Sequence, residues 1–215
     1  MHAYGFGPIR DNPQRNNLRP DPGTEGAQEF YPVAHLGFRM WRFDPLREVL
    51  CSTIDFVTVG YIDWEMDGVM EASCAFKKCD PVPNPSHTCG IYARNSPDKV
   101  ISGEYATTIT RARFHYGAVK HRPHVAGVIA AWGEVEHYDE GFKASRARIL
   151  CLFEPEEVRT SWAPSFEVDP SLLPAFYRMC ERHKIPVLPR KFFTDPAFVR
   201  LYAEERGLVL AEDLL

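Results

Sequence analysis

The chain has 215 residues, a length that suits one medium-sized domain with at most a small extension. Hydrophobic residues make up 45% of the chain and aromatic residues 13%, which is enough for a packed core and excludes global disorder. The formal net charge of −4 gives no electrostatic signature of nucleic-acid binding, so nucleic acid is not an expected partner.

Neither a membrane span nor a secretory signal is recognisable. No stretch approaches the ~18 consecutive apolar residues of a transmembrane helix, and residues 1–14 lack a charged region followed by an apolar run. We therefore expect no membrane partner. Six cysteines without a signal peptide are more typical of reduced thiols or metal ligands than of a disulfide framework, which favours a cytoplasmic protein.

The N-terminal residues 1–30 are rich in proline, glycine and asparagine and contain few aliphatic side chains. Such a segment buries too little surface to offset the entropy of ordering, so we expect a flexible arm. Residues 31–215 are expected to form a single domain.

The first part of this domain is predicted to be rich in strands. Residues 36–43, "LGFRMWRF", show a period of two with bulky side chains on both faces, and Asp44-Pro45 predicts a turn. Further strands are expected near residues 48–52, 55–64 and 89–93. Residues 124–138 suit a central strand, and residues 142–153 suit its hairpin partner.

Helix signals occur at three places. Ser96-Pro97 predicts a helix between strands, while Asp169-Pro170 and Asp195-Pro196 predict two C-terminal helices, the second ending at Gly207. The sequence therefore predicts an α+β fold: a mostly antiparallel sheet with one helix between strands and two C-terminal helices. We expect a β-rich core over residues 31–160 and a helical part over residues 161–215.

The passage "CAFKKCDPVPNPSHTCG" has the greatest chemical potential. It contains Cys74, Cys79, His87 and Cys89, the number and type of donors that structural zinc prefers. Prolines at positions 81, 83 and 85 would stiffen the loop and lower the entropy of assembling such a site. The passage predicts a structural zinc site with these four ligands.

The same residues have a second interpretation. The spacing C-x4-C-x7-H-x-C is not that of a standard zinc finger or ribbon, and a regular strand would place His87 and Cys89 on one face. Cys74 and Cys89 also suit small buried side chains at strand ends, where free cysteine is common. The sequence leaves both interpretations open.

Three short elements carry a resemblance to a protein family. "GFRMW", "HTCGIYA" and "WGEVEHYDEGFKASRA" resemble an uncharacterised family of actinobacterial and actinobacteriophage proteins, over roughly residues 36–153. His87 stands where that family shows a cysteine, which keeps a ligand at this position. The family's third element contains a histidine. In this chain the corresponding histidine, His137, stands at a shifted position. The resemblance implies no established activity.

A fainter resemblance leads to an enzymatic alternative. "CGIYA" is similar to a strand of the ADP-ribosyltransferases, whose tyrosine stacks on the nicotinamide of NAD. The resemblance implies roles for Arg39 or Arg42, for Tyr92, and for Glu134 or Glu136. A glutamate bonded to the ribose would stabilise oxocarbenium charge.

Two other groups of side chains are candidates for sites. His115, His121 and His124, together with His137, suggest a second metal or proton-transfer site, although solvated loop histidines are more common. Glu134, Glu136, Asp139 and Glu140 form an acidic patch, for which exposure is the ordinary outcome.

The sequence therefore favours a non-enzymatic protein that binds another macromolecule, most simply a protein, with zinc in the loop at residues 74–89. An NAD-using enzyme and a phage structural or accessory component are the alternatives. The oligomeric state is left open.

Overall fold

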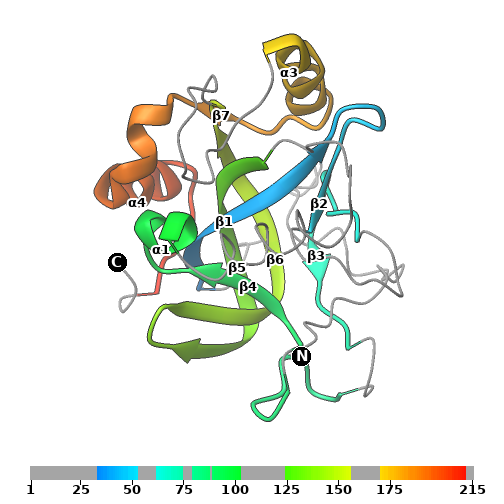
Figure 1. The fold of residues 1–215 in the computed structure, drawn as a ribbon. Coiled ribbons are helices and arrows are strands. Elements are labelled where there is room, and N and C mark those ends of the chain that lie inside the picture. Colours follow the sequence, from blue (N-terminus) through cyan, green and yellow to red (C-terminus); the bar gives the residue numbers. More distant parts are fainter. Residues whose placement is uncertain are drawn as a thin grey trace, which may run out of the picture.

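In a computed structural model, the described residues are 33–52, 62–74, 79–87, 89–102, 124–155 and 170–211. They form one seven-stranded sheet with a few helices, which confirms the α+β prediction (Figure 1). The strands are β1 (His35–Asp44), β2 (Val49–Ser52), β3 (Met70–Glu71), β4 (Ile91–Arg94), β5 (His124–Tyr138), β6 (Gly141–Phe153) and β7 (Val187–Leu188). The helices are α1 (Pro97–Ser102), α3 (Leu173–Arg182), α4 (Pro196–Glu205) and the 3-10 turns η2 (Pro170–Leu172) and η3 (Arg190–Thr194).

Some predictions lie outside the described residues. They include the arm at residues 1–30, most of the expected strand 55–64, and the histidines at positions 115 and 121. The two-part division of residues 31–215 stays a prediction.

The sheet closes on itself at one end. β5 lies between β1 and β6, and the other edges of β1 and β6 both pair with β4. These four strands therefore form a ring, completed by the pair Phe38 and Arg94. β2 extends the edge of β1, while β3 and β7 extend the edge of β6. All pairs of strands are antiparallel except β6 with β7.

The bulky alternation of β1 is explained by burial on both faces. Trp41 and Phe43 belong to a core inside the ring, whereas Phe38 and Met40 belong to a second core on the outer face. Hydrophobic side chains on both faces are typical of a strand that is covered on both sides.

Each core is covered by a different helix. Phe176 of α3 packs edge-on against Phe43, with ring centroids 5.9 Å apart, so α3 covers one end of the ring. Val199 and Ala203 of α4, and Val100 of α1, pack on the outer core. In Figure 1, α1 and α4 lie on the same side of the sheet. The helical C-terminal part therefore contacts both faces of the sheet.

The helix starts partly follow the predicted caps. The Asp195 carboxylate accepts a hydrogen bond from the Phe198 amide at 3.0 Å, and α4 ends before Gly207, whose φ is +77°, as expected. The other C-terminal helix differs from the prediction. Residues from Pro170 first form a 3-10 turn, and α3 begins at Leu173 without a side-chain cap.

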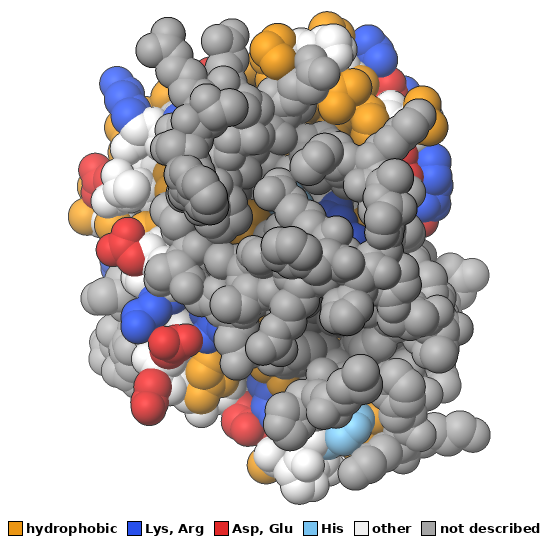
Figure 2. Space-filling view, in the orientation of Figure 1, with side chains coloured by type: hydrophobic (Ala, Val, Ile, Leu, Met, Phe, Trp, Pro, Cys, Tyr) orange, Lys and Arg blue, Asp and Glu red, His pale blue; other side chains and the backbone are white. Residues whose placement is uncertain are grey.

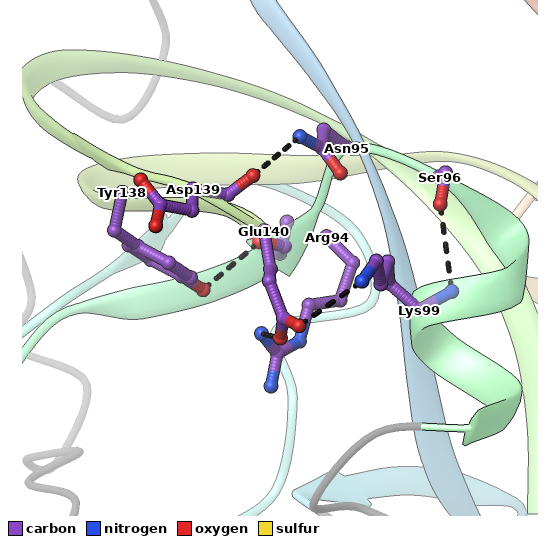
Figure 3. Close-up of polar contacts among 8 residues, drawn as sticks. Arg94, Asn95, Ser96, Lys99, Tyr138, Asp139 and Glu140 are labelled. Atoms are coloured by element: carbon purple, nitrogen blue, oxygen red, sulfur yellow. Dashed lines mark hydrogen bonds and ion pairs between the residues drawn. The ribbon is translucent and has the colours of Figure 1, made fainter.

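The turn of the β5–β6 hairpin is tied to the end of β4 by polar contacts (Figure 3). The Glu140 carboxylate accepts from Arg94 at 2.7 Å and from Lys99 at 3.2 Å, and these two cations lower its pKa, Lys99 most. The side-chain amide of Asn95 donates to the backbone carbonyl of Asp139 at 3.2 Å. The C-terminal end of β4 is therefore fixed to the hairpin.

Two further observations concern the cysteines and the helices. None of the six cysteines forms a disulfide, which agrees with the expectation of free thiols or metal ligands. Among the described residues, no helix is both long enough and apolar enough to cross a membrane.

A substitution at Gly37 tests whether β1 and β4 approach closely and close the ring. A Cβ atom at this position would lie 2.4 Å from the Ala93 Cβ and 2.8 Å from the Phe142 ring. The variant G37A is therefore expected to destabilise the fold by about 1–3 kcal/mol through overpacking. Thermal unfolding measures the effect.

Gly68 is the matched control, because a Cβ atom there meets only the Glu65 side chain, at 3.7 Å. The free energy of unfolding of the variant G68A should lie within about 0.5 kcal/mol of that of the unmodified chain. Equal melting temperatures for both variants would contradict the close approach of β1 and β4.

Candidate metal centre

The structure brings the four predicted zinc ligands together. One donor atom from each of Cys74, Cys79, His87 and Cys89 lies within 4.8 Å of the other three. Among the described residues, no other group of three or more such side chains comes together in this way. This Cys3His group can hold a metal ion such as zinc.

Two sulfur–nitrogen distances fit the size of a zinc tetrahedron. The His87 Nδ1 atom lies 3.4 Å from the Cys74 sulfur and 3.6 Å from the Cys79 sulfur. With Zn–S bonds of about 2.3 Å and Zn–N bonds of about 2.0–2.1 Å, the sulfur–nitrogen edge of a tetrahedron is about 3.6 Å. Nδ1 is therefore the nitrogen placed for ligation.

β6 brings the two ends of the loop together. β3 pairs with β6 through Met70 and Ala147, and β4 pairs with it through Ile91 and Ala144. Cys74 follows β3 by three residues and Cys89 precedes β4 by two. The pairing of both arms with one strand thus places distant ligands at the same edge of the sheet.

The middle of the loop is shaped by local hydrogen bonds. The His87 amide donates to the Asn84 carbonyl at 3.0 Å, and the Asn84 side-chain oxygen accepts from the Ser86 amide at 3.0 Å. This turn directs His87 toward the sulfurs. His87 is not part of a strand, so the concern about one strand face carrying both His87 and Cys89 does not arise.

Gly90 allows the loop to approach β6 closely. Its φ of +127° suits glycine, and a Cβ atom there would lie 3.1 Å from both the Pro83 Cβ and the Lys143 Cβ. Pro83 is buried, whereas Pro81 and Pro85 are exposed, and the stiffening role of the prolines stays a prediction. The residue after Cys89 therefore has to be small.

The setting of the Cys79 thiol disfavours its ionisation without metal. Burial, followed by hydrogen bonds with Cys74 and Cys89, raises the pKa of the Cys79 thiol to about 11. Cys89 is buried and the other three ligands are half-buried. Because zinc binds thiolates, metal binding here must release protons.

Lys143 is a neighbour of the site that the sequence analysis missed. Its ammonium donates to the carbonyls of Asn84 and His87, at 2.9 Å each, and forms an ion pair with Glu136 at 3.0 Å. In the sequence of β6, Lys143 is one of three basic residues and has Phe142 and Ala144 on either side. Only the pairing of β4 with β6 reveals that this lysine faces the loop.

The residues of the NAD alternative are only partly brought together. Tyr92 and Glu136 lie on either side of Lys143 in the register of three neighbouring strands. Glu134 is exposed at a bulge, and Arg42 lies opposite His124, at the far end of β5 from Glu136. Arg42 and Glu136 therefore do not share a site.

Arg39, the other basic residue considered, is buried inside the ring. Its guanidinium donates to the Tyr92 carbonyl and lies over the Trp64 ring, 4.7 Å from the centroid. Through these contacts Arg39 holds the backbone of β4, and neither of them involves the Tyr92 side chain.

The prediction of a second histidine site is wrong in part. His124 and His137 lie at opposite ends of β5, so they do not meet in one site. The His137 ring instead lies 5.0 Å from the ring of His35. The acidic patch is also divided, because Glu136 pairs with Lys143 while Glu140 pairs with Arg94 and Lys99.

Comparison with protein-family models, curated proteins and solved structures finds no match for this chain.

Zinc affinity should depend on pH. Since the Cys79 thiol has a pKa of about 11 without metal, zinc must displace its proton at neutral pH. The zinc Kd is expected to fall at least about tenfold per pH unit between pH 6.5 and 7.5, because each displaced proton contributes a factor of ten. Competition with a chromophoric chelator measures this, and a pH-independent Kd would contradict thiolate ligation.

Proposed function

We propose that this is a non-enzymatic protein that binds another macromolecule and whose loop at residues 74–89 is held by a structural zinc ion. One observation carries the proposal: the donor atoms of Cys74, Cys79, His87 and Cys89 lie within 4.8 Å of one another. Three sulfurs and an imidazole at this separation are a typical donor set for structural zinc.

The number of ligands favours a structural role for the metal. A catalytic zinc site usually has three protein ligands and keeps one position open for water or substrate. Here four protein side chains can fill the tetrahedron. The metal would therefore stabilise the loop and would not activate a water molecule.

The shape of the loop supports binding of another protein. Between its ligands it exposes Asp80, Pro81, Pro85 and Ser86. A zinc ion would hold these side chains in one arrangement, which lowers the entropy lost when a partner binds. In this proposal the zinc-held loop is part of the recognition surface of a cytoplasmic protein.

The charge distribution supports a protein rather than a nucleic-acid partner. In the described part of the face in Figure 2, basic and acidic side chains are interspersed and are not gathered by sign. The chain as a whole carries a net charge of −4. Nucleic-acid binding usually requires a continuous basic surface.

The zinc proposal predicts one equivalent of metal in the purified protein. The variant C74S should lower the bound zinc to below about 0.2 equivalents or weaken its affinity strongly, since one thiolate ligand is lost. With free zinc at about 1,000 times its Kd, the unmodified chain should gain about 4 kcal/mol of stability, or roughly 10 °C. Elemental analysis and thermal unfolding before and after chelation measure both effects.

Cys180 provides the control, because it is buried in α3 and is not one of the four ligands. The variant C180A should retain one equivalent of zinc even if its melting temperature falls. The zinc proposal would be wrong if the unmodified chain held less than about 0.2 equivalents of zinc and its half-buried Cys74 and Cys79 thiols reacted as fast before chelation as after it.

A further inference from the structure

Lys143 places a buried positive charge beside the candidate metal centre. It lies in β6, where Phe142 and Ala144 on either side belong to the core inside the ring. The Lys143 side chain is only 6% exposed. A lysine is rarely buried to this extent unless its charge is paired.

The contacts of this ammonium use two of its N–H donors and pair its charge. A lysine ammonium has three N–H donors. Three partners surround it: it donates to the Asn84 carbonyl and to the His87 carbonyl, at 2.9 Å each, and forms an ion pair with the Glu136 carboxylate at 3.0 Å. Two of the three belong to the turn that carries the ligand His87.

The register of the sheet makes these contacts specific. Tyr92 in β4, Lys143 in β6 and Glu136 in β5 lie side by side across three strands. The ammonium therefore connects the loop to the central hairpin, and Gly90 leaves the space that its side chain needs.

The charge of the occupied site complements this cation. Three thiolates, a neutral imidazole and Zn²⁺ together carry a net charge of −1. A buried ammonium next to the ligand loop stabilises that charge, while the Glu136 carboxylate opposes it. Residues that bond to the ligand-bearing backbone also fix the orientation of a metal ligand.

We propose that Lys143 is a positioning residue of the metal centre, which orients the Asn84–His87 turn through its two carbonyls and compensates the negative charge of the zinc–thiolate group. This inference rests on the proposed zinc site. It assigns the Lys143–Glu136 pair to metal binding rather than to NAD chemistry.

The experiment measures the zinc Kd of four variants by chelator competition and the absorption spectrum of their Co²⁺ forms. K143M should weaken zinc binding about 10–100-fold and broaden or shift the Co²⁺ bands, because the His87 ligand loses its orientation. K143R, which keeps the charge and the donors, should restore most of the affinity.

The variant E136Q distinguishes an effect of charge on zinc binding from an effect of the Lys143–Glu136 contact itself. Glutamine keeps an oxygen acceptor for the ammonium but removes the opposing negative charge, so zinc binding should be unchanged or tighter. The control is R146M, which removes a 42% exposed cation of the same strand that pairs with Glu71. Its zinc Kd should stay within about threefold of that of the unmodified chain.

The outcomes distinguish the two proposals. If the unmodified chain does not bind zinc, the zinc site fails and the role of Lys143 fails with it. If the unmodified chain binds zinc but K143M matches its affinity and Co²⁺ spectrum, only the role of Lys143 is overturned. Equal weakening of zinc binding by E136Q and K143M would also overturn it. That result would show that the Lys143–Glu136 ion pair as a whole, and not the charge of the lysine, supports the site. If K143M does not fold, K143Q takes its place with the same expected direction.

Discussion

The pairing of β6 with four other strands is the constraint on which the rest of the structure depends. β6 forms the long hairpin with β5, and its opposite edge pairs with β4, β3 and β7 in turn. Because β3 and β4 bracket the cysteine-rich loop, their adjacent positions on one strand bring Cys74 and Cys89 together. The candidate metal centre is therefore a consequence of strand order as much as of the loop sequence.

Irregularities in the hairpin let one strand serve these neighbours. A register shift between Trp132 and Val135 coincides with Gly133, whose φ is +85°, and another lies between Val128 and Ile129. Bulges of this kind bend a strand and increase its twist. The bend allows β5 and β6 to curve, so that β1 and β4 can meet and close the ring.

Most elements could be predicted from local sequence patterns. The alternation in residues 36–43 and the Asp195-Pro196 start each act over a few residues, and the structure confirms both. The donor set of the metal site was predicted for the same reason, since four ligands lie within one short passage.

The parts that were missed depend on contacts between distant residues. Nothing near Lys143 in the sequence shows that its ammonium meets carbonyls of residues 84 and 87, because that contact follows from the β4–β6 register. The same holds for the separation of His124 from His137, which requires the whole length of β5. Ring closure through Phe38 and Arg94 is likewise a long-range property.

The most direct test of the account is X-ray absorption at the zinc edge of the purified, zinc-loaded protein. The expected result is a first shell of three sulfurs at about 2.3 Å and one nitrogen at about 2.0–2.1 Å. A shell made only of oxygen and nitrogen atoms, or one with fewer than three sulfurs, would contradict a site built from Cys74, Cys79, His87 and Cys89.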